Sequence, residues 1–226
     1  GLGDVYKRQR MPLRAQGGPQ WNMAVADLLR TVFCVCLLGI TACAERVELG
    51  PGVFAARSPL QEPVEGKAFT HAGFTLVPRA TIELSAKVLS KQRYRFDELA
   101  PAVPWDFALG WGAMSDESWL AGTKVMQGDR FMFWHLYDSP LNLPLVERSS
   151  ANMHLIPANA SVLALMSSTP QGSIIQLYGR LVDLHLPDGE RVIPTSLSRL
   201  DRGPGACEIV YVESLSVVRG GAGAES

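Results

Sequence analysis

The amino-acid sequence predicts a mainly β domain, either an OB-like β-barrel or a strongly curled antiparallel sheet, with a few short helices. Three observations predict it: apolar and polar residues alternate along extended stretches, a glycine interrupts the longest of these stretches, and Pro- and Gly-rich pairs mark tight turns. A sandwich of two sheets is the alternative that these observations leave open.

The first predicted strand covers residues 81–89. Its even-numbered positions, beginning with Ile82 and Leu84, are apolar, and its odd-numbered positions up to Lys87 are polar. A period of two predicts a strand with one buried face. The run 130–137 is apolar or aromatic on both faces, so we expect a central or covered strand there.

The longest predicted strand covers residues 173–186 and has Gly179 at its middle. A glycine inside a strand indicates a bend or bulge, as when a sheet curls toward closure. The triplet 187–189 (Pro-Asp-Gly) predicts a tight hairpin turn, which returns the chain through residues 190–195. A last strand is expected from Cys207 to about Val217.

Two short helices are expected between the strands. Residues 115–121 begin with Ser115, which is a favourable N-cap, and have acidic residues in the first turn. Asn159 is the expected N-cap of a second run over residues 161–166.

An apolar segment over residues 31–40 precedes the predicted domain. It is much shorter than the roughly 20 residues that a helix needs to span a bilayer, and Arg30 before it and small residues after it have the layout of a secretory signal. The tetrapeptide 40–43 (Ile-Thr-Ala-Cys) resembles the lipobox of bacterial lipoproteins. A buried helix and an ordinary secretory signal are the alternatives.

The lipobox resemblance implies that the signal is cut before Cys43 and that Cys43 carries the lipid anchor. It also implies an outer-membrane location facing the periplasm, because Ala44 rather than aspartate follows the cysteine. Multiple acyl chains make such anchoring stable, at about 0.8 kcal/mol per buried methylene. Met11 and Met23 are both candidate starts of this leader.

The expected organisation has five parts. Residues 4–9 resemble the translated end of a transposon used to prepare sequencing libraries, so the first part is excluded from reasoning about fold. The segment after Cys43 is rich in Pro, Gly and Glu, which is typical of a tether. The parts are a read-through leader (1–22), a lipoprotein signal (23–42), the lipidated cysteine and flexible tether (43–70), one β-rich domain (71–218) and a flexible tail (219–226).

Charge and cysteine content restrict the possible partners. The formal net charge is −1, so the chain lacks the basic footprint of a nucleic-acid-binding protein. Removing the signal and assigning Cys43 to the anchor leaves only Cys207 in the domain. We expect Cys207 to be a small buried hydrophobe, with a reactive or bridging thiol as the alternative.

The candidate binding residues are tryptophans and arginines. Trp111 lies between two glycines and is either a ligand platform or an aromatic plug. Trp105 and Trp134 either join it in a groove for a glycan, a peptide or an apolar molecule, or belong to the core. Arg199 and Arg202 either form an anion-binding loop or pair with a neighbouring aspartate to secure that loop.

The catalytic candidates are fewer and less specific. His154, Ser150 and Asp201 are the residue types of a hydrolase triad, but triads are recognised by geometry and not by order, and no G-x-S-x-G motif is present. A hydrogen-bonded structural histidine is therefore the preferred interpretation of His154. We expect no metal site and no cofactor.

Four blocks stand out by composition: residues 107–116, 149–157, 195–199 and 201–208. In order and spacing they resemble an uncharacterised bacterial protein family, over roughly residues 74–215. That family has no assigned activity, so the resemblance does not imply one for this chain. The function expected from the sequence is therefore a non-catalytic envelope lipoprotein whose β-rich domain binds an envelope protein, a glycan or a small ligand. The alternative is a periplasmic hydrolase that uses His154 with a nearby serine and Asp201.

Overall fold

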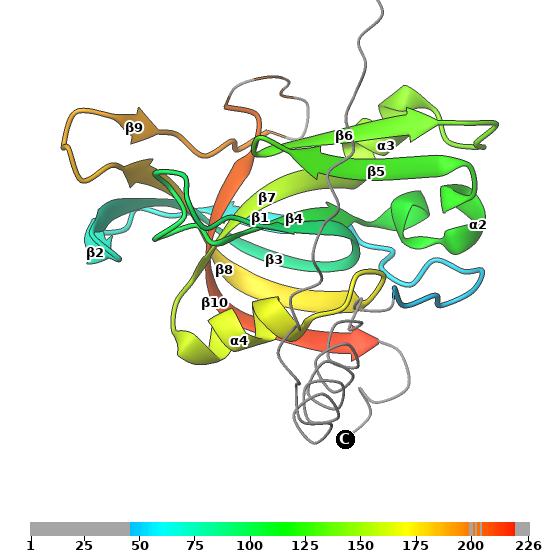
Figure 1. The fold of residues 1–226 in the computed structure, drawn as a ribbon, viewed down its shortest axis with the longest axis horizontal. Helices are drawn as coiled ribbons and strands as arrows, with labels where there is room; N and C mark the ends of the chain where they lie inside the picture. Colours follow the sequence, from blue (N-terminus) through cyan, green and yellow to red (C-terminus); the bar gives the residue numbers. More distant parts are fainter. Residues whose placement is uncertain (1–45, 199–200, 202, 204, 220–226) are drawn as a thin grey trace, which may run out of the picture. The chain divides into compact units, whose positions relative to one another are not determined.

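The computed structural model describes residues 46–198, 201, 203 and 205–219, which fall in the unit Ala44–Ser226. Strands dominate this unit and its helices are short (Figure 1), so the predicted mainly β fold is confirmed. The strands are β1 (Leu60–Pro63), β2 (Phe69–His71), β3 (Phe74–Arg93), β4 (Trp105–Gly110), β5 (Thr123–Gly128), β6 (Phe131–Leu136), β7 (Ser150–Pro157), β8 (Ile174–His185), β9 (Val192–Ile193) and β10 (Glu208–Arg219). The helices are the 3₁₀ turn η1 (Gly112–Ser115), α2 (Glu117–Leu120), α3 (Leu143–Ser149) and α4 (Ala160–Ser168).

Five strands pair in a closed ring in the order β3, β4, β7, β10 and β8, because β8 pairs with both β10 and β3. β7 and β10 run parallel, and the other pairs of the ring are antiparallel. α4 connects β7 to β8 and buries Val162 and Met166 in the core cluster that the ring encloses. The closure of the ring favours the strongly curled sheet over the two-sheet sandwich.

The alternation predicted for residues 81–89 lies within the long strand β3. Ile82 and Leu84 are buried in the core, as expected. Lys87, on the predicted polar face, is also fully buried, and its Nζ lies 2.6 Å from Oε1 of Glu117 in α2. Glu117 comes from another part of the chain, so the local pattern of β3 does not reveal that Lys87 has an opposite charge to pair with when it is buried.

Gly179 lies at a close approach of the β8 backbone to β10. A Cβ at this position would come within 2.2 Å of the Tyr211 carbonyl oxygen, so only glycine fits beside β10. The pairing of β8 with β10 shifts register between Val212 and Ser214, directly next to Gly179. The predicted bulge is therefore present, with the extra residue on the partner strand.

β5 and β6 form a separate two-stranded sheet. Phe131 and Phe133 on β6 are exposed, while Met132 and Trp134 pack against a core cluster. The prediction of a central or covered strand for residues 130–137 is therefore wrong. A two-stranded hairpin has one face on the body of the protein, so its other face stays in solvent whatever its composition.

The segment predicted as a tether packs against the domain from residue 46 onward. Val47 donates a backbone hydrogen bond of 2.8 Å to the Gln171 carbonyl, and Ala55 is 2 % exposed. β1, within the same segment, pairs with β3. These contacts differ from the flexible tether expected over 43–70, because the local composition does not reveal backbone groups that pair with distant partners.

The predicted caps and turn lie close to their expected positions. The Asn159 side chain accepts a hydrogen bond of 3.0 Å from the Val162 N–H and begins α4. α2 begins one residue later than expected, with Asp116 as its cap in place of Ser115. β8 and β9 pair antiparallel around the turn at 187–189, where Gly189 has a φ of +75°.

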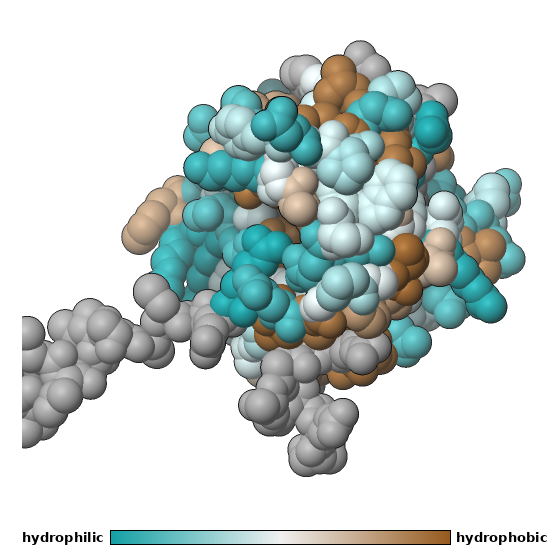
Figure 2. All heavy atoms as spheres, turned by 90° about the vertical axis from the view of Figure 1, so that its right-hand side faces the viewer, coloured by the Kyte–Doolittle hydropathy of each residue, from teal (hydrophilic) through white to brown (hydrophobic). Residues whose placement is uncertain are grey.

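The face shown in Figure 2 has several separate hydrophobic areas among hydrophilic residues. Scattered exposed apolar residues are normal on soluble domains. No helix in the part of the chain that the structure describes is long and apolar enough to cross a membrane.

Candidate functional site

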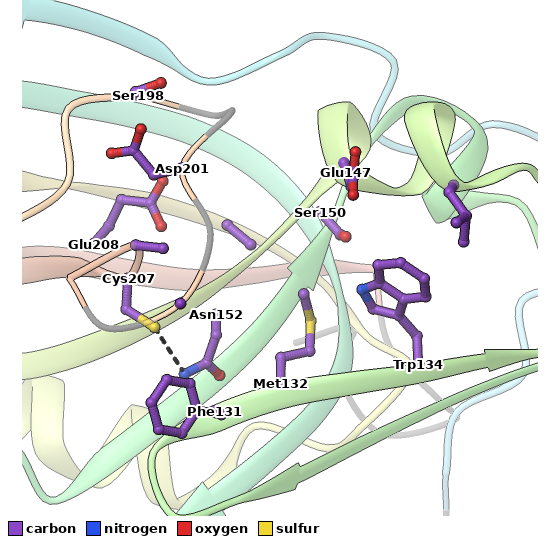
Figure 3. Close-up of a pocket in the computed structure, with 14 residues that line it drawn as sticks. Phe131, Met132, Trp134, Glu147, Ser150, Asn152, Ser198, Asp201, Cys207 and Glu208 are labelled. Carbon is purple, nitrogen blue, oxygen red and sulfur yellow. Dashed lines mark hydrogen bonds between the residues drawn. The ribbon is translucent and has the colours of Figure 1, made fainter.

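A cavity of about 420 Å³ lies between the β5–β6 hairpin, the start of β7 and the segment that leads into β10 (Figure 3). Its volume is in the range of small-molecule sites, roughly 300–1,000 Å³. One wall is apolar and consists of Phe131, Met132, Trp134 and Leu143. The polar lining residues include Asn152, Ser198, Asp201, Cys207 and Glu208.

The apolar wall is held by the turn of the hairpin. Asp129 and Arg130 have φ values of +50° and +69°, the left-handed conformation that a two-residue hairpin turn requires at both central positions. Alternation along β6 then directs Met132 and Trp134 toward the body of the domain.

The Arg130 side chain connects this turn to residues 94–106, which run from the end of β3 into β4. Its guanidinium donates to Asp97 at 2.7 and 3.1 Å, to the Val103 carbonyl at 3.0 Å and to Asp106 Oδ1 at 3.0 Å. It also lies 3.9 Å from the centre of the Tyr94 ring. Burial raises the pKa of Asp97, but the hydrogen bond and positive charge of Arg130, together with the backbone N–H groups of Ala100 and Leu99, outweigh it, so the net pKa is below the ordinary value.

His154 lies behind the cavity, on the outer face of β7. Its Nδ1 is 2.9 Å from Oδ1 of Asp106, which is fully buried on the neighbouring strand β4. Burial lowers the pKa of His154, but the contact with Asp106 and a hydrogen bond with Cys207 outweigh it and raise this pKa to about 9. The imidazole is therefore protonated at neutral pH.

Cys207 lines the cavity, next to Asn152 and the hairpin turn. Its Sγ lies 3.8 Å from Asn152 Nδ2, the contact drawn in Figure 3, and 3.8 Å from the Arg130 carbonyl oxygen. Asn152 is itself fixed, because its Oδ1 accepts from Gln127 Nε2 at 2.7 Å and its Nδ2 donates to the Arg130 carbonyl at 2.9 Å. The thiol is thus held between β7 and the hairpin turn.

The structure separates the three candidate tryptophans. Trp105 and Trp111 are buried in the core that the ring encloses, and the Trp111 indole donates to the Arg148 carbonyl at 3.1 Å. Trp105 therefore belongs to the core, and Trp111 is an aromatic plug rather than a ligand platform. Trp134 alone of the three lines the cavity.

The three catalytic candidates do not contact one another as a triad would. Ser150 lines the cavity, but its hydroxyl donates to the Val146 carbonyl at 2.8 Å. Asp201 accepts from the Ser196 hydroxyl at 2.9 Å. The partners of His154 are instead Asp106 and Cys207.

The remaining candidates lie outside the described residues. These are the lipidation site Cys43 and the arginines Arg199 and Arg202. Within the described ranges, no group of three or more His, Cys, Asp or Glu side chains is placed to hold a metal ion.

Sequence reasoning missed Asp106 and Arg130 as parts of the site. Asp106 is a lone acid in a strand of otherwise buried apolar or small residues, Trp105–Gly110, and such a residue needs a buried partner. Arg130 follows the Gly-Asp pair of the hairpin turn. Both signals are visible in the sequence, but neither identifies the partner.

Comparison with known proteins finds no match: no family model, no curated protein and no solved structure is similar to the chain.

Proposed function

We propose that this domain is a binding module of the cell envelope that takes a small amphipathic molecule, or an exposed part of a peptide or glycan, in the cavity beside the β5–β6 hairpin. The observation that carries the proposal is the cavity itself, with an apolar aromatic wall on one side and polar groups on the other. Most small-molecule sites combine these two kinds of lining.

The apolar wall supports the binding role. Trp134 and Phe131 offer rigid rings with a large contact area, which lose little conformational entropy on binding. Met132 beside them is flexible and adapts its shape to a ligand. The wall therefore suits the apolar part of an amphipathic ligand, and the polar groups opposite suit its hydrophilic part.

The envelope location rests on the sequence alone. The short apolar segment and the lipobox-like tetrapeptide ending in Cys43 support a lipid anchor. Mass spectrometry of the mature N-terminus tests it: the expected product begins at Cys43 and carries acyl chains. Cys43→Ala should move the protein out of the membrane fraction, and an unmodified Cys43 in the mature chain would overturn the anchor.

The cavity is tested with N-phenyl-1-naphthylamine, an uncharged fluorescent probe that brightens in apolar sites. Trp134→Ala should raise the dissociation constant of the probe by about tenfold, since an aromatic contact contributes about 0.5–1.5 kcal/mol beyond its buried area. Trp119→Ala is the matched control, because Trp119 is an exposed tryptophan on α2 that does not line the cavity.

Two results would refute the cavity as a binding site. One is that the unaltered protein does not bind the probe. The other is that Trp134→Ala and Trp119→Ala bind it equally, while both variants keep cooperative thermal unfolding.

A further inference from the structure

The β5–β6 hairpin carries a row of exposed aromatic side chains on the face turned away from the domain. The row consists of alternate residues, Phe131, Phe133, His135 and Tyr137. The rings of Phe131 and Phe133 have their centres 6.5 Å apart, and those of His135 and Tyr137 lie 6.1 Å apart. Side chains alternate along a strand, so this row lies opposite Trp134, which packs against the core. These rings form one continuous surface and are not scattered over the molecule.

A tryptophan extends this surface where β6 ends. Trp119 in α2 is 39 % exposed, and its carbonyl accepts a hydrogen bond of 3.4 Å from the Ser139 hydroxyl. The Tyr137 N–H donates to the Gly122 carbonyl at 2.6 Å. α2 and the end of β6 therefore lie together at one end of the molecule (Figure 1). We call Trp119, Phe133 and Tyr137 the aromatic face; Phe133 and Tyr137 are 51 % and 59 % exposed.

The first described residues of the chain are fixed beside α2. Nη2 of Arg46 lies 3.3 Å from Oε2 of Glu117, two residues before Trp119 in the same helix. The next residue, Val47, donates a backbone hydrogen bond of 2.8 Å to the Gln171 carbonyl. The backbone bond and the ion pair together hold this point of the chain against the end of the domain that carries the aromatic face.

Only a short piece of chain joins this point to the proposed lipid anchor. Cys43 and Arg46 are three residues apart in the sequence, and an extended chain covers about 3.3–3.6 Å per residue, so the link is at most about 11 Å long. A domain of about 170 residues has a radius of gyration of roughly 16 Å. With acyl chains on Cys43, the link is too short to hold the domain clear of the leaflet, so the surface around Arg46 lies against it.

The side chains of the aromatic face suit this position. Tryptophan and tyrosine are enriched at the boundary between membrane and water, because each has an apolar ring with a polar group at its edge. Two exposed charges of opposite sign border the face: Lys124, opposite His135 across the hairpin, and Asp138, next to Tyr137. These two charges cancel, so the contact depends on burial of the rings and not on attraction to anionic headgroups.

We propose that the aromatic face lies in the interfacial region of the phospholipid leaflet that holds the Cys43 anchor, as a second contact between the domain and the membrane. This inference rests on the lipid anchor of the proposed function and goes beyond it by assigning the face that meets the bilayer. The leaflet is favoured over a second copy or a protein partner, because the short link between Cys43 and Arg46 leaves little room for either between this end of the domain and the lipid.

The first test is photochemical crosslinking of the acylated protein in vesicles of phosphatidylethanolamine and phosphatidylglycerol. With Tyr137→p-benzoylphenylalanine or Phe133→p-benzoylphenylalanine, illumination should attach phospholipid to the labelled peptide, detected by mass spectrometry. The matched control places the same group at Tyr178, a 44 % exposed tyrosine on β8 between Glu83 and Ser214 on the neighbouring strands, and should form no lipid adduct. The adducts at Tyr137 and Phe133 should persist at high salt, which screens attraction between charges but not ring burial.

The second test uses a native ring as the probe. Vesicles that contain brominated phosphatidylcholine should quench tryptophan emission of the acylated protein, because bromine on the acyl chains quenches rings that lie at the membrane interface. Trp119→Phe should remove this quenching. Trp134→Phe is the matched control and should keep it, because Trp134 lines the cavity and packs against the core.

The outcomes separate this inference from the anchor on which it rests. No lipid adduct at Tyr137 and Phe133, equal adducts at Tyr178, or quenching that persists in Trp119→Phe would overturn the membrane contact while an acylated Cys43 leaves the anchor in place. Adducts to protein instead of lipid would also overturn it and would identify a protein partner. An unmodified Cys43 would overturn the anchor and this inference together, and the naphthylamine probe tests the cavity independently of both.

Discussion

The two faces of β4 and β7 are both buried, but they are buried in different ways. On the inner face, Phe107 and Met153 pack in the apolar core that the ring encloses. On the outer face of the same strands, Asp106 and His154 pair with each other beneath the β5–β6 hairpin and the segment before β10. The strands alternate between these environments residue by residue.

The inner face of these strands stabilises the fold, whereas the outer face holds buried charged groups. The inner face gains from removal of apolar surface and close packing, which need no special partner. The outer face contains charges that are costly to bury unless each finds an opposite charge. Asp106 Oδ2 is buried without a hydrogen-bond partner among the described residues, so this face is less well satisfied than a purely structural network would be.

The largest expected effect is on the inner face. Phe107→Ala should lower the free energy of unfolding by about 3–5 kcal/mol, because it removes a fully buried ring from the core. Urea unfolding followed by circular dichroism measures the loss. Phe107→Leu, which keeps most of the volume, is the control and should cost less than about 1.5 kcal/mol. Similar small losses for both variants would contradict the division between the faces.

The second effect is on the outer face and depends on pH. The pKa of His154 is raised from 6.5 to about 9 in the folded protein, so folding favours the protonated form. The resulting stabilisation is complete below pH 6.5 and is lost as pH rises toward about 9, by up to about 3 kcal/mol.

The measurement is the free energy of unfolding between pH 6 and pH 10, for the unaltered chain and for His154→Gln. The difference between the two curves isolates the imidazole from other titrating groups. A difference that stays constant across this range would show that Asp106 does not hold the proton on His154.

The smallest effect concerns an uncharged contact on the outer face. Ser150→Ala should lower the free energy of unfolding by about 1 kcal/mol, because it removes a hydrogen bond of 2.8 Å to the Val146 carbonyl. Thermal or urea unfolding measures it, and Thr169→Ala, which removes the similar bond to the Leu165 carbonyl at the end of α4, gives a reference. A loss for Ser150→Ala as large as that for Phe107→Ala would remove the contrast between the faces.

The mainly β class, the alternation in β3 and the Asn159 cap follow from the sequence. Each depends on residues that are close together along the chain, so the local pattern contains the information. From residue 46 onward the expected tether makes contacts with the domain, and the strand expected to be covered over 130–137 has an exposed face. The local composition does not show which distant surface a segment contacts.

In the candidate site, too, local patterns are visible in the sequence and long-range contacts are not. Trp134 and His154 are visible as candidates in the sequence, but the partners Asp106 and Cys207 are not identifiable, since nothing local relates three separate segments to one another.

By itself, the sequence determined which residues alternate, turn and cap, because those preferences arise within a few neighbouring residues. It also contains the apolar segment and the cysteine on which the anchor proposal rests. The tertiary structure decided that Lys87 is buried against Glu117 and that the His154 imidazole lies 2.9 Å from the buried carboxylate of Asp106. Closure of the five-strand ring and folding of the hairpin over its outer face bring these groups together, and such long-range contacts have no signature in local sequence.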